Sequence, residues 1–145
     1  MALTEILICL VVGISDGDTL TARCGNVGQY QQIKIRLAEI DAPEKSQPFG
    51  QRSKEHLSDL CFQQVASIAP QTKDRYGRTV ARVQCRGQDA SASLITAGMA
   101  WAFTKYLTDP EIKRLEMQAK NSQIGLWADQ QPVAPWEFRK STKSK

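Results

Sequence analysis

Acidic and basic side chains gather in four short segments of this chain. The segments are Asp16-Gly17-Asp18-Thr19, Arg36-Leu37, Asp41-Ala42-Pro43-Glu44 and Asp74-Arg75-Tyr76-Gly77-Arg78. Guanidinium groups stay charged and offer planar, paired donors, which suit the negative charge that develops on a phosphate during hydrolysis. Carboxylate oxygens suit a hard cation that polarises the phosphate and activates a water molecule, and another carboxylate can accept the proton of that water. Residues of these types could together support metal-assisted hydrolysis at a phosphate.

Taken singly, each segment also has an ordinary structural interpretation. Asp16-Gly17 is typical of a tight turn, and Asp18 directly after it could belong to the same turn. Arg36 could be a solvated residue on the polar face of a strand. The segment from Asp41 to Glu44 could be a plain loop, and Arg78 beside a Tyr-Gly turn is equally ordinary.

Alternating hydrophobicity predicts a three-stranded meander at the start of the chain. The apolar run from Ile6 to Ile14 is followed by Asp16-Gly17, which is a strong hairpin signal, and then by a second strand over residues 19–24. In the third strand, apolar residues at 33, 35 and 37 alternate with polar ones. The meander places Asp18 just beyond a turn and Arg36 in the third strand.

The rest of the chain predicts three helices and two further strands. We expect a helix over residues 48–63, strands over 65–69 and 79–85, a second helix from Asp89 to Gly98 and a third from Asp109-Pro110 to about Gly125. Five strands, with a helix inserted after the third, predict an α+β fold built on a five-stranded OB-fold barrel with three helices. We expect one domain over residues 1–129 and a polar, basic C-terminal tail over residues 130–145.

In this order and at this spacing, the four segments resemble the staphylococcal (micrococcal) nuclease family. The similarity runs from about Leu7 to Trp127 and includes Gly98-Met99-Ala100 and Gly125-Leu126-Trp127. The closing Pro135-Trp136-Glu137-Phe138-Arg139 resembles an extension found in bacterial members. The resemblance implies a calcium-dependent endonuclease that cleaves DNA and RNA with weak sequence preference and leaves 3′-phosphates.

The resemblance also implies a role for each candidate residue. It assigns calcium binding to Asp18 and Asp41, the role of general base to Glu44, and phosphate binding to Arg36 and Arg78. These five side chains are the expected catalytic and metal-binding set.

Four further positions complete the site that the resemblance implies. The main-chain carbonyl of Ala42 would be another calcium ligand; the archetype of the family has Thr there, and the exchange keeps the carbonyl but removes a hydroxyl group. Arg75 and Tyr76 would line a nucleotide pocket, with Tyr106 as a second wall. The alternative for Tyr76 is a ring that packs where the chain enters a strand.

Charge and aromatic content bear on a second class of function. The formal charge of +4 favours contact with polyanions, but Arg139, Lys140, Lys143 and Lys145 account for the whole excess. The alternative function is a non-catalytic nucleic-acid-binding OB-fold module. A single-strand binder of that kind needs several exposed aromatic residues, whereas aromatics make up only 7% of this chain. We expect a monomer with no membrane partner.

The cysteines and the histidine carry less information. The four cysteines lack the close spacing of a zinc site, and His56, the single histidine, lies outside the four segments. If Asp16-Gly17 forms a two-residue turn, Cys9 lies opposite Cys24 and the pair could form a disulfide; equally, both could be small buried hydrophobic residues.

The apolar run near the N-terminus bears on where the protein resides. No Lys or Arg precedes residues 6–14, and the run is too short to span a bilayer, so we interpret it as a strand. We expect a secreted or periplasmic protein whose leader is absent from this sequence, with a cytoplasmic location as the alternative.

Overall fold

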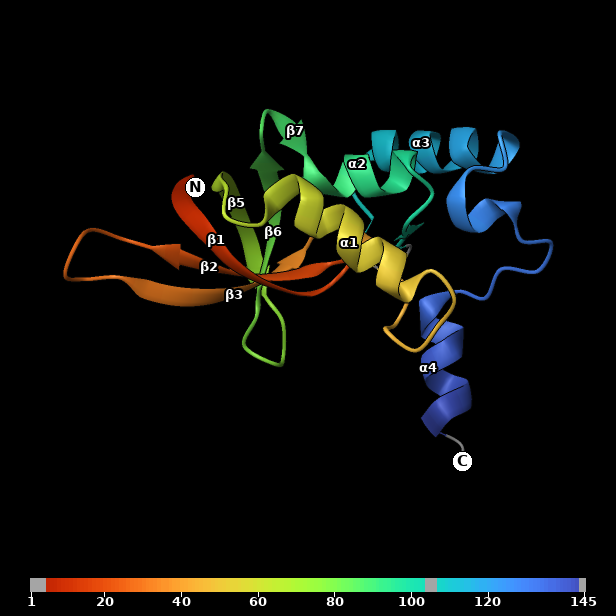
Figure 1. Ribbon diagram of the computed structural model, residues 1–145, viewed down its shortest axis with the longest axis horizontal. Coiled ribbons are helices and arrows are strands. Elements are labelled where there is room, and N and C mark those ends of the chain that lie inside the picture. Colours follow the sequence, from red (N-terminus) through yellow and green to blue (C-terminus); the bar gives the residue numbers. More distant parts are fainter. Residues whose placement is uncertain (1–4, 104–106, 144–145) are drawn as a thin grey trace.

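Five strands of this protein close into a barrel (Figure 1). The computed structural model describes residues 5–103 and 107–143. The barrel strands are β1 (Leu7–Asp16), β2 (Thr19–Cys24), β3 (Gln31–Leu37), β5 (Val65–Lys73) and β6 (Thr79–Cys85). Antiparallel pairing joins them in the order β3-β2-β1-β5-β6, and parallel pairing of β3 with β6 closes the circle. The α+β fold with an OB-fold barrel is therefore confirmed.

Alternate side chains of the strands fill the barrel. The buried set comprises Cys9, Val11, Leu20, Ala22, Ile35, Leu37, Ala66, Ile68, Ala81 and Val83. Successive side chains of a strand point to opposite faces. Because Ile35 and Leu37 point into the core, Arg36 between them points away from it.

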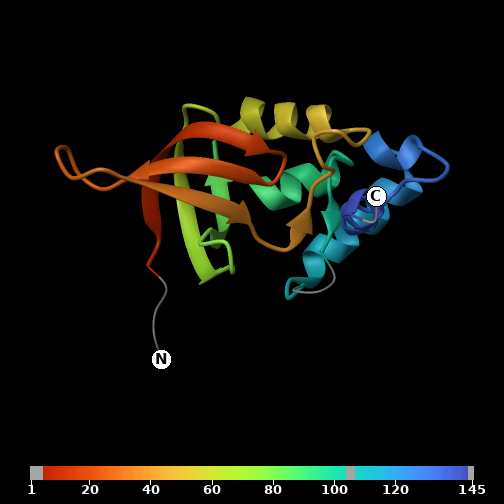
Figure 2. The same ribbon diagram turned by 90° about the horizontal axis from the view of Figure 1, so that it is seen from below.

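The described residues form four α-helices, whereas the sequence predicted three. They are α1 (Gly50–Cys61), α2 (Ala90–Thr96), α3 (Pro110–Asn121) and α4 (Pro135–Lys143). Helix α1 packs against β1, and α2 packs against α1, α3 and β6 (Figure 2). The side chains of Asp89 and Asp109 accept hydrogen bonds from backbone N–H groups in the first turns of α2 and α3, so these two predicted helix starts are confirmed. No helix in residues 5–103 and 107–143 is long and apolar enough to cross a membrane.

The fourth helix lies in the segment that we expected to be a tail. Helix α4 lies near the loop that leads into α1 (Figure 1), and the ring of Trp136 lies 5.6 Å from that of Trp101 and 6.0 Å from that of Phe103. This segment is polar and has no clear apolar period, so its sequence did not predict a helix. Contacts of Trp136 and Arg139 with distant residues hold the helix in place instead. The division of the chain at Asp129 stays a prediction.

Very short elements complete the fold beside the barrel. Strand β4 (Ile40–Asp41) pairs with β8 (Trp101–Ala102), which places Asp41 opposite Trp101. Strand β7 (Gln88–Asp89) pairs with the end of β6, and a 3-10 turn, η2 (Gly125–Ala128), follows α3.

Arg82 on β6 links the barrel to these outer elements. Its guanidinium lies 2.7 Å from a carboxylate oxygen of Glu39 and 2.9 Å from those of Asp89 and Asp109. Glu39 precedes β4, and the two aspartates cap α2 and α3. One arginine therefore joins both helix starts to the segment that leads into β4 and Asp41.

Two disulfides pair the four cysteines. Cys9 lies opposite Cys24 in the β1–β2 register and is bonded to it, which is the pairing that the sequence suggested. The turn itself is Gly17-Asp18 rather than Asp16-Gly17, because Asp16 pairs with Thr19, and two register shifts in β1 restore the opposition of the two cysteines. Cys61 at the end of α1 is bonded to Cys85 at the end of β6. The second bond was not predicted, because the two residues meet only through the tertiary fold.

Candidate active site

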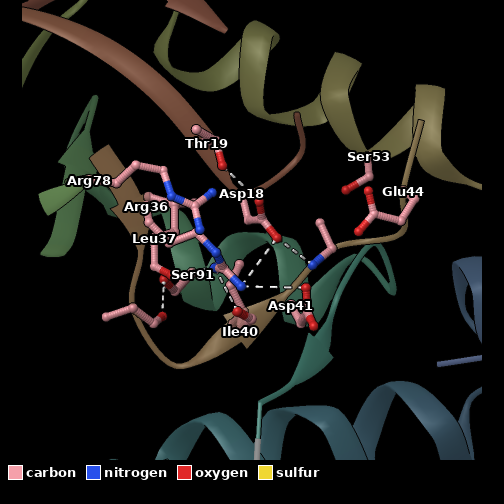
Figure 3. Close-up of polar contacts among 12 residues, drawn as sticks. Asp18, Thr19, Arg36, Leu37, Ile40, Asp41, Glu44, Ser53, Arg78 and Ser91 are labelled. Atoms are coloured by element: carbon pink, nitrogen blue, oxygen red, sulfur yellow. Dashed lines mark hydrogen bonds and ion pairs between the residues drawn. The ribbon is translucent and has the colours of Figure 1, made fainter. Parts of the chain in front are cut away.

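Asp18 is held at the rim of the barrel by two hydrogen bonds (Figure 3). The backbone N–H of Ala42 donates to Asp18 Oδ2 at 2.7 Å, and Thr19 Oγ1 donates to Asp18 Oδ1 at 3.0 Å. The side chain of Asp18 is almost fully buried. It therefore ties the β1–β2 turn to the loop that follows β4, across 24 residues of sequence.

The turn that contains Asp18 lies so close to α1 that residue 17 has to be glycine. A Cβ atom on Gly17 would lie 1.9 Å from Ser53 Oγ and 3.0 Å from the Cβ of Ala42. Ser53 is fully buried on α1, where its hydroxyl donates to the carbonyl of Met99 at 2.8 Å and leaves it no room to withdraw. The turn is thus seated against α1, which fixes the position of Asp18.

Arg36 lies between the two candidate metal-binding carboxylates. Its Nη1 donates to the carbonyls of Leu37 and Ile40, both at 2.8 Å. Its Nη2 lies 3.6 Å from Asp18 Oδ2 and 3.4 Å from Asp41 Oδ1. The guanidinium is therefore fixed by the chain around β4 and brings Asp18 and Asp41 to one point.

Asp41 is the most deeply buried carboxylate of the site. Only 2% of its side chain is exposed. Burial raises the pKa of Asp41; a hydrogen bond from Arg139 lowers it and the charge of Asp18 raises it again, so that the pKa lies above its ordinary value. This carboxylate gains from any additional positive charge placed beside it.

Arg139 on α4 supplies such a charge. Its Nη2 donates to Asp41 Oδ2 at 2.6 Å, and its Nη1 donates to Glu44 Oε1 at 2.7 Å and, less closely, to Asp41 Oδ1 at 3.3 Å. One guanidinium therefore bridges the candidate metal ligand and the candidate general base. These contacts raise the pKa of Arg139 further above its ordinary value, with the hydrogen bond to Asp41 as the largest cause.

Glu44 extends from a loop that the side chain of Gln47 anchors. Its backbone N–H donates to Gln47 Oε1 at 3.1 Å, and the side chain of Gln47 donates to the carbonyl of Val133 at 2.5 Å. The side chain of Glu44 is 34% exposed, so water can reach it. Gln47 thus connects the backbone of Glu44 to the segment before α4.

Arg78 enters the same region from the loop between β5 and β6. Its Nε donates to Asp74 Oδ2 at 2.7 Å, and Asp74 also accepts the backbone N–H groups of Tyr76 and Arg78. In Figure 3 the side chain of Arg78 extends toward Arg36 and Asp18. Burial is the largest single influence on the pKa of Asp74 and raises it, but the hydrogen bonds from Arg78 and Tyr76 and the charge of Arg78 together outweigh burial and hold the pKa below its ordinary value.

The neighbouring pair Arg75 and Tyr76 is exposed. Tyr76 is 68% exposed, its hydroxyl accepts from Arg75 Nη2 at 2.9 Å, and the guanidiniums of Arg75 and Arg78 lie over its ring. The ring of Tyr76 is therefore open to solvent on the loop between β5 and β6, and its role stays a prediction. Tyr106, the expected second wall of the pocket, lies outside the described residues.

The site offers a cation two buried carboxylates rather than a complete cage. Within residues 5–103 and 107–143, no three His, Cys, Asp or Glu side chains gather closely enough to hold a metal ion. Calcium takes roughly six to eight oxygen ligands and tolerates irregular geometry. The donor chemistry of Asp18 and Asp41 fits that ion, and the remaining ligands would have to be main-chain carbonyls, water or substrate oxygens.

Comparison with known proteins identifies the family. Residues 34–129 match the family described as staphylococcal nuclease homologues. The chain belongs to the staphylococcal nuclease family. An uncharacterized endonuclease of Haemophilus influenzae is 49% identical over 135 residues, which cover 93% of this chain and 74% of the relative. The micrococcal nuclease of Shigella flexneri is 37% identical over 145 residues, with coverage of 92% and 81%.

A plant relative extends the comparison. The staphylococcal-like nuclease CAN1 of Arabidopsis thaliana is 32% identical over 113 residues, which cover 78% of this chain and 35% of that protein. Membership of the staphylococcal nuclease family, together with these nuclease-named relatives, supports an endonuclease.

Three residues of the site were not predicted from the sequence. Arg139 belongs to the extension that the resemblance noted, but nothing in the sequence paired it with Asp41. Gln47 gave no signal at all. Asp16 was interpreted as a turn residue, whereas it ends β1 and pairs with Thr19 next to Asp18; burial and then the charge of Asp18 raise its pKa.

Proposed function

We propose that this member of the staphylococcal nuclease family is a calcium-dependent endonuclease that hydrolyses phosphodiester bonds of DNA and RNA with weak sequence preference and leaves 3′-phosphates. The observation that carries the proposal is the convergence of Asp18 and Asp41 on Arg36, at 3.6 and 3.4 Å, with Glu44 on the loop that follows. Buried carboxylates, a guanidinium and a water-accessible carboxylate are the groups that metal-assisted phosphodiester hydrolysis needs.

The proposed calcium ligands are Asp18, Asp41 and the main-chain carbonyl of Ala42. When bound, calcium would polarise the phosphate and lower the pKa of a nearby water. The hydrogen bond from the Ala42 N–H to Asp18 supports this assignment, because it holds the three groups together in the protein itself. Such preorganisation reduces the cost of ordering the site when ligands arrive.

Glu44 is the proposed general base. Its carboxylate would accept a proton from the water that attacks phosphorus, while Arg36 and Arg78 bind the non-bridging oxygens as their charge increases. The bond from phosphorus to the 5′ oxygen then breaks, and that oxygen takes up a proton from solvent water. The phosphate stays on the 3′ oxygen, which accounts for 3′-phosphate products.

Arg75, Tyr76 and Tyr106 are the proposed contacts to the nucleotide next to the scissile bond. The ring of Tyr76 is exposed, which supports a stacking contact with a base at this residue. Bases stack on aromatic rings with little dependence on sequence. Stacking of this kind agrees with weak sequence preference.

The proposed location is an oxidising compartment, either the periplasm or the cell exterior. The two disulfides support it, because cytosolic thiols are normally kept reduced. The proposed working form is a monomer without a membrane partner.

The test is release of acid-soluble nucleotides from DNA and from RNA, with calcium or with a chelator. We expect release from both substrates only with calcium, and fragments that carry a 5′-hydroxyl and a 3′-phosphate. Binding of DNA without any release in calcium would favour the non-catalytic OB-fold module instead. Fragments with 5′-phosphates would contradict the proposed direction of cleavage.

A further inference from the structure

The C-terminal segment is attached to the loop that carries Glu44 at three places. Gln47 Nε2 bonds the carbonyl of Val133, Trp136 packs against Trp101 opposite Asp41, and Arg139 reaches Asp41 and Glu44. Figure 1 shows α4 at the end of the chain beside this loop. The C-terminal segment is therefore part of the surroundings of the site, although 95 residues separate Arg139 from Glu44 in the sequence.

The side chain of Glu44 needs an external constraint to take one position. Glutamate has several rotatable bonds, and Glu44 is 34% exposed, so solvent alone would allow many rotamers. The charge of Asp16 repels it, and Asp41, which shares the guanidinium of Arg139 with Glu44, is a second nearby carboxylate. Without a positive partner, this repulsion would drive the side chain of Glu44 outward into water.

Arg139 supplies that constraint with a rigid group. Its planar guanidinium donates from one nitrogen to Glu44 Oε1 at 2.7 Å and from the other to Asp41 Oδ2 at 2.6 Å. A fork of this kind fixes the two carboxylates relative to each other, which a single ammonium point charge does less well. Asp41 is itself fixed by burial and by Arg36. Through Arg139, the carboxylate of Glu44 is therefore held relative to a residue that does not move.

We propose that Arg139 is a positioning residue for phosphodiester hydrolysis: it holds the carboxylate of Glu44 at a set place beside Asp41. The inference rests on the proposed function, in which Glu44 is the general base. Arg139 acts through Glu44 rather than on the substrate. Loss of a supporting contact of this kind costs about 10- to 100-fold in activity.

A different role would have the opposite consequence. If Arg139 served as a built-in competitor for the cation, removing it would strengthen calcium binding and raise activity. Positioning predicts reduced turnover without a gain in calcium affinity. The two roles therefore differ in the sign of the effect.

The experiment compares Arg139→Gln and Arg139→Lys with the wild type and with Arg114→Gln. Arg114 is a matched control because it is exposed and pairs with Glu111 on α3, away from the site. With DNA and calcium, we expect Arg139→Gln to lower kcat by about 10- to 100-fold while KM stays near the wild-type value. Arg139→Lys should recover part of the loss, and Arg114→Gln should behave as the wild type.

A double-mutant cycle separates positioning from general damage. In the Glu44→Gln background, Arg139→Gln should cause little further loss, because the group that it positions no longer accepts a proton. Fluorescence of the tryptophans around Trp136 should be unchanged in Arg139→Gln, which would show that α4 remains docked. An equal loss in both backgrounds, or a rise in kcat with tighter calcium binding, would overturn the proposal.

A measurement without metal or substrate tests the same claim independently of activity. Carbon-13 relaxation of the Glu44 carboxyl group in metal-free protein should show a restricted side chain in the wild type and a mobile one in Arg139→Gln. Equal mobility in both would refute positioning even if the enzyme is active. Failure of the wild type to cleave nucleic acid would refute the proposed function, and the relaxation result would still decide whether Arg139 orders Glu44.

Discussion

Glu44 has the environment that a general base requires. It is reachable by water, its carboxylate accepts a hydrogen bond from Arg139, and it lies on a loop whose backbone is anchored through Gln47. The buried neighbour Asp41 is less suited to proton transfer from solvent, because it is enclosed and engaged by two arginines. The structure thus separates two carboxylates that are only three residues apart in sequence.

The first prediction concerns this residue. Glu44→Gln should lower kcat by about 100- to 10,000-fold, the usual contribution of general base catalysis, and should leave the free energy of unfolding nearly unchanged, since the amide oxygen can still accept from Arg139. Steady-state cleavage and denaturant unfolding measure the two effects. Glu55→Gln, at an exposed position on α1, is the control. Turnover equal to that of the wild type would remove Glu44 from the base role.

The contacts of single residues were harder to predict than their place in the fold. Asp18, Arg36 and Asp41 lie together because the hairpin and the β3–β4 segment carry them to one end of the barrel, and their roles stay a prediction. That Arg36 would be fixed by two carbonyls was not predictable, since such bonds depend on the path of the backbone. Arg139 could not be paired in advance, because 95 residues separate it from Glu44.

Helices α1 and α2 meet at a histidine that plays no part in the proposed chemistry. His56 on α1 lies 2.8 Å from the hydroxyl of Ser93 on α2. Burial lowers the pKa of His56, and the charge of Asp59 only partly opposes this. The native protein therefore keeps His56 neutral at a pH where the unfolded chain, with a pKa of about 6.5, binds a proton.

The second prediction is a pH dependence of stability that this histidine causes. As the pH falls from about 7.5 to about 5.5, the unfolded state takes up the proton first, so the free energy of unfolding should decrease. His56→Gln should lack that part of the decrease. Urea unfolding of both proteins at the two pH values measures it. Equal decreases would show that His56 does not keep a lowered pKa.

The third prediction concerns the β1–β2 hairpin. The bond between Cys9 and Cys24 closes a loop with a sequence separation of 15, so replacing both residues by serine should reduce the free energy of unfolding by about 3 kcal/mol at most. Non-reducing peptide mapping should find this bond and the one between Cys61 and Cys85. Free thiols at Cys9 and Cys24, in protein isolated from its native compartment, would contradict the prediction.

Elements with strong local signals were predicted well. The β1–β2 hairpin and the capping residues Asp89 and Asp109 were predicted because turn and cap chemistry is local, although the turn is Gly17-Asp18 and not Asp16-Gly17. The pairing of β4 with β8 was missed, since strands of two residues carry no periodicity. Helix α4 was missed because distant contacts through Trp136 and Arg139 hold it.

The whole molecule uses its charge differently from what composition suggests. The excess of positive charge resides in the C-terminal residues, and a basic tail would ordinarily serve to attract polyanions. Arg139, one of these residues, instead lies against Asp41 and Glu44. Part of the excess thus offsets the acidic site rather than adding to a basic surface.

Barrel, helices and C-terminal segment together form the site. The barrel supplies Asp18, Arg36 and Arg78 from its turns and strand ends, and α1 supports the turn that contains Asp18 through Ser53. Helix α4 adds Arg139 from the opposite end of the chain. Asp18 and Asp41 are therefore the centre of the site, since Ala42, Arg36 and Arg139 all contact one or both of them.

The most direct test of calcium binding by Asp18 and Asp41 is a titration of calcium and magnesium into chelator-stripped enzyme while DNA cleavage is followed. Wild type, Asp18→Asn, Asp41→Asn and the exposed control Asp59→Asn would be compared. Calcium should activate the wild type and the control, and magnesium should substitute poorly, because it demands near-octahedral geometry and gives up water reluctantly. Both site variants should require more calcium while still binding DNA through Arg36 and Arg78. Full activity without divalent metal, or unchanged calcium dependence in both site variants, would contradict the account.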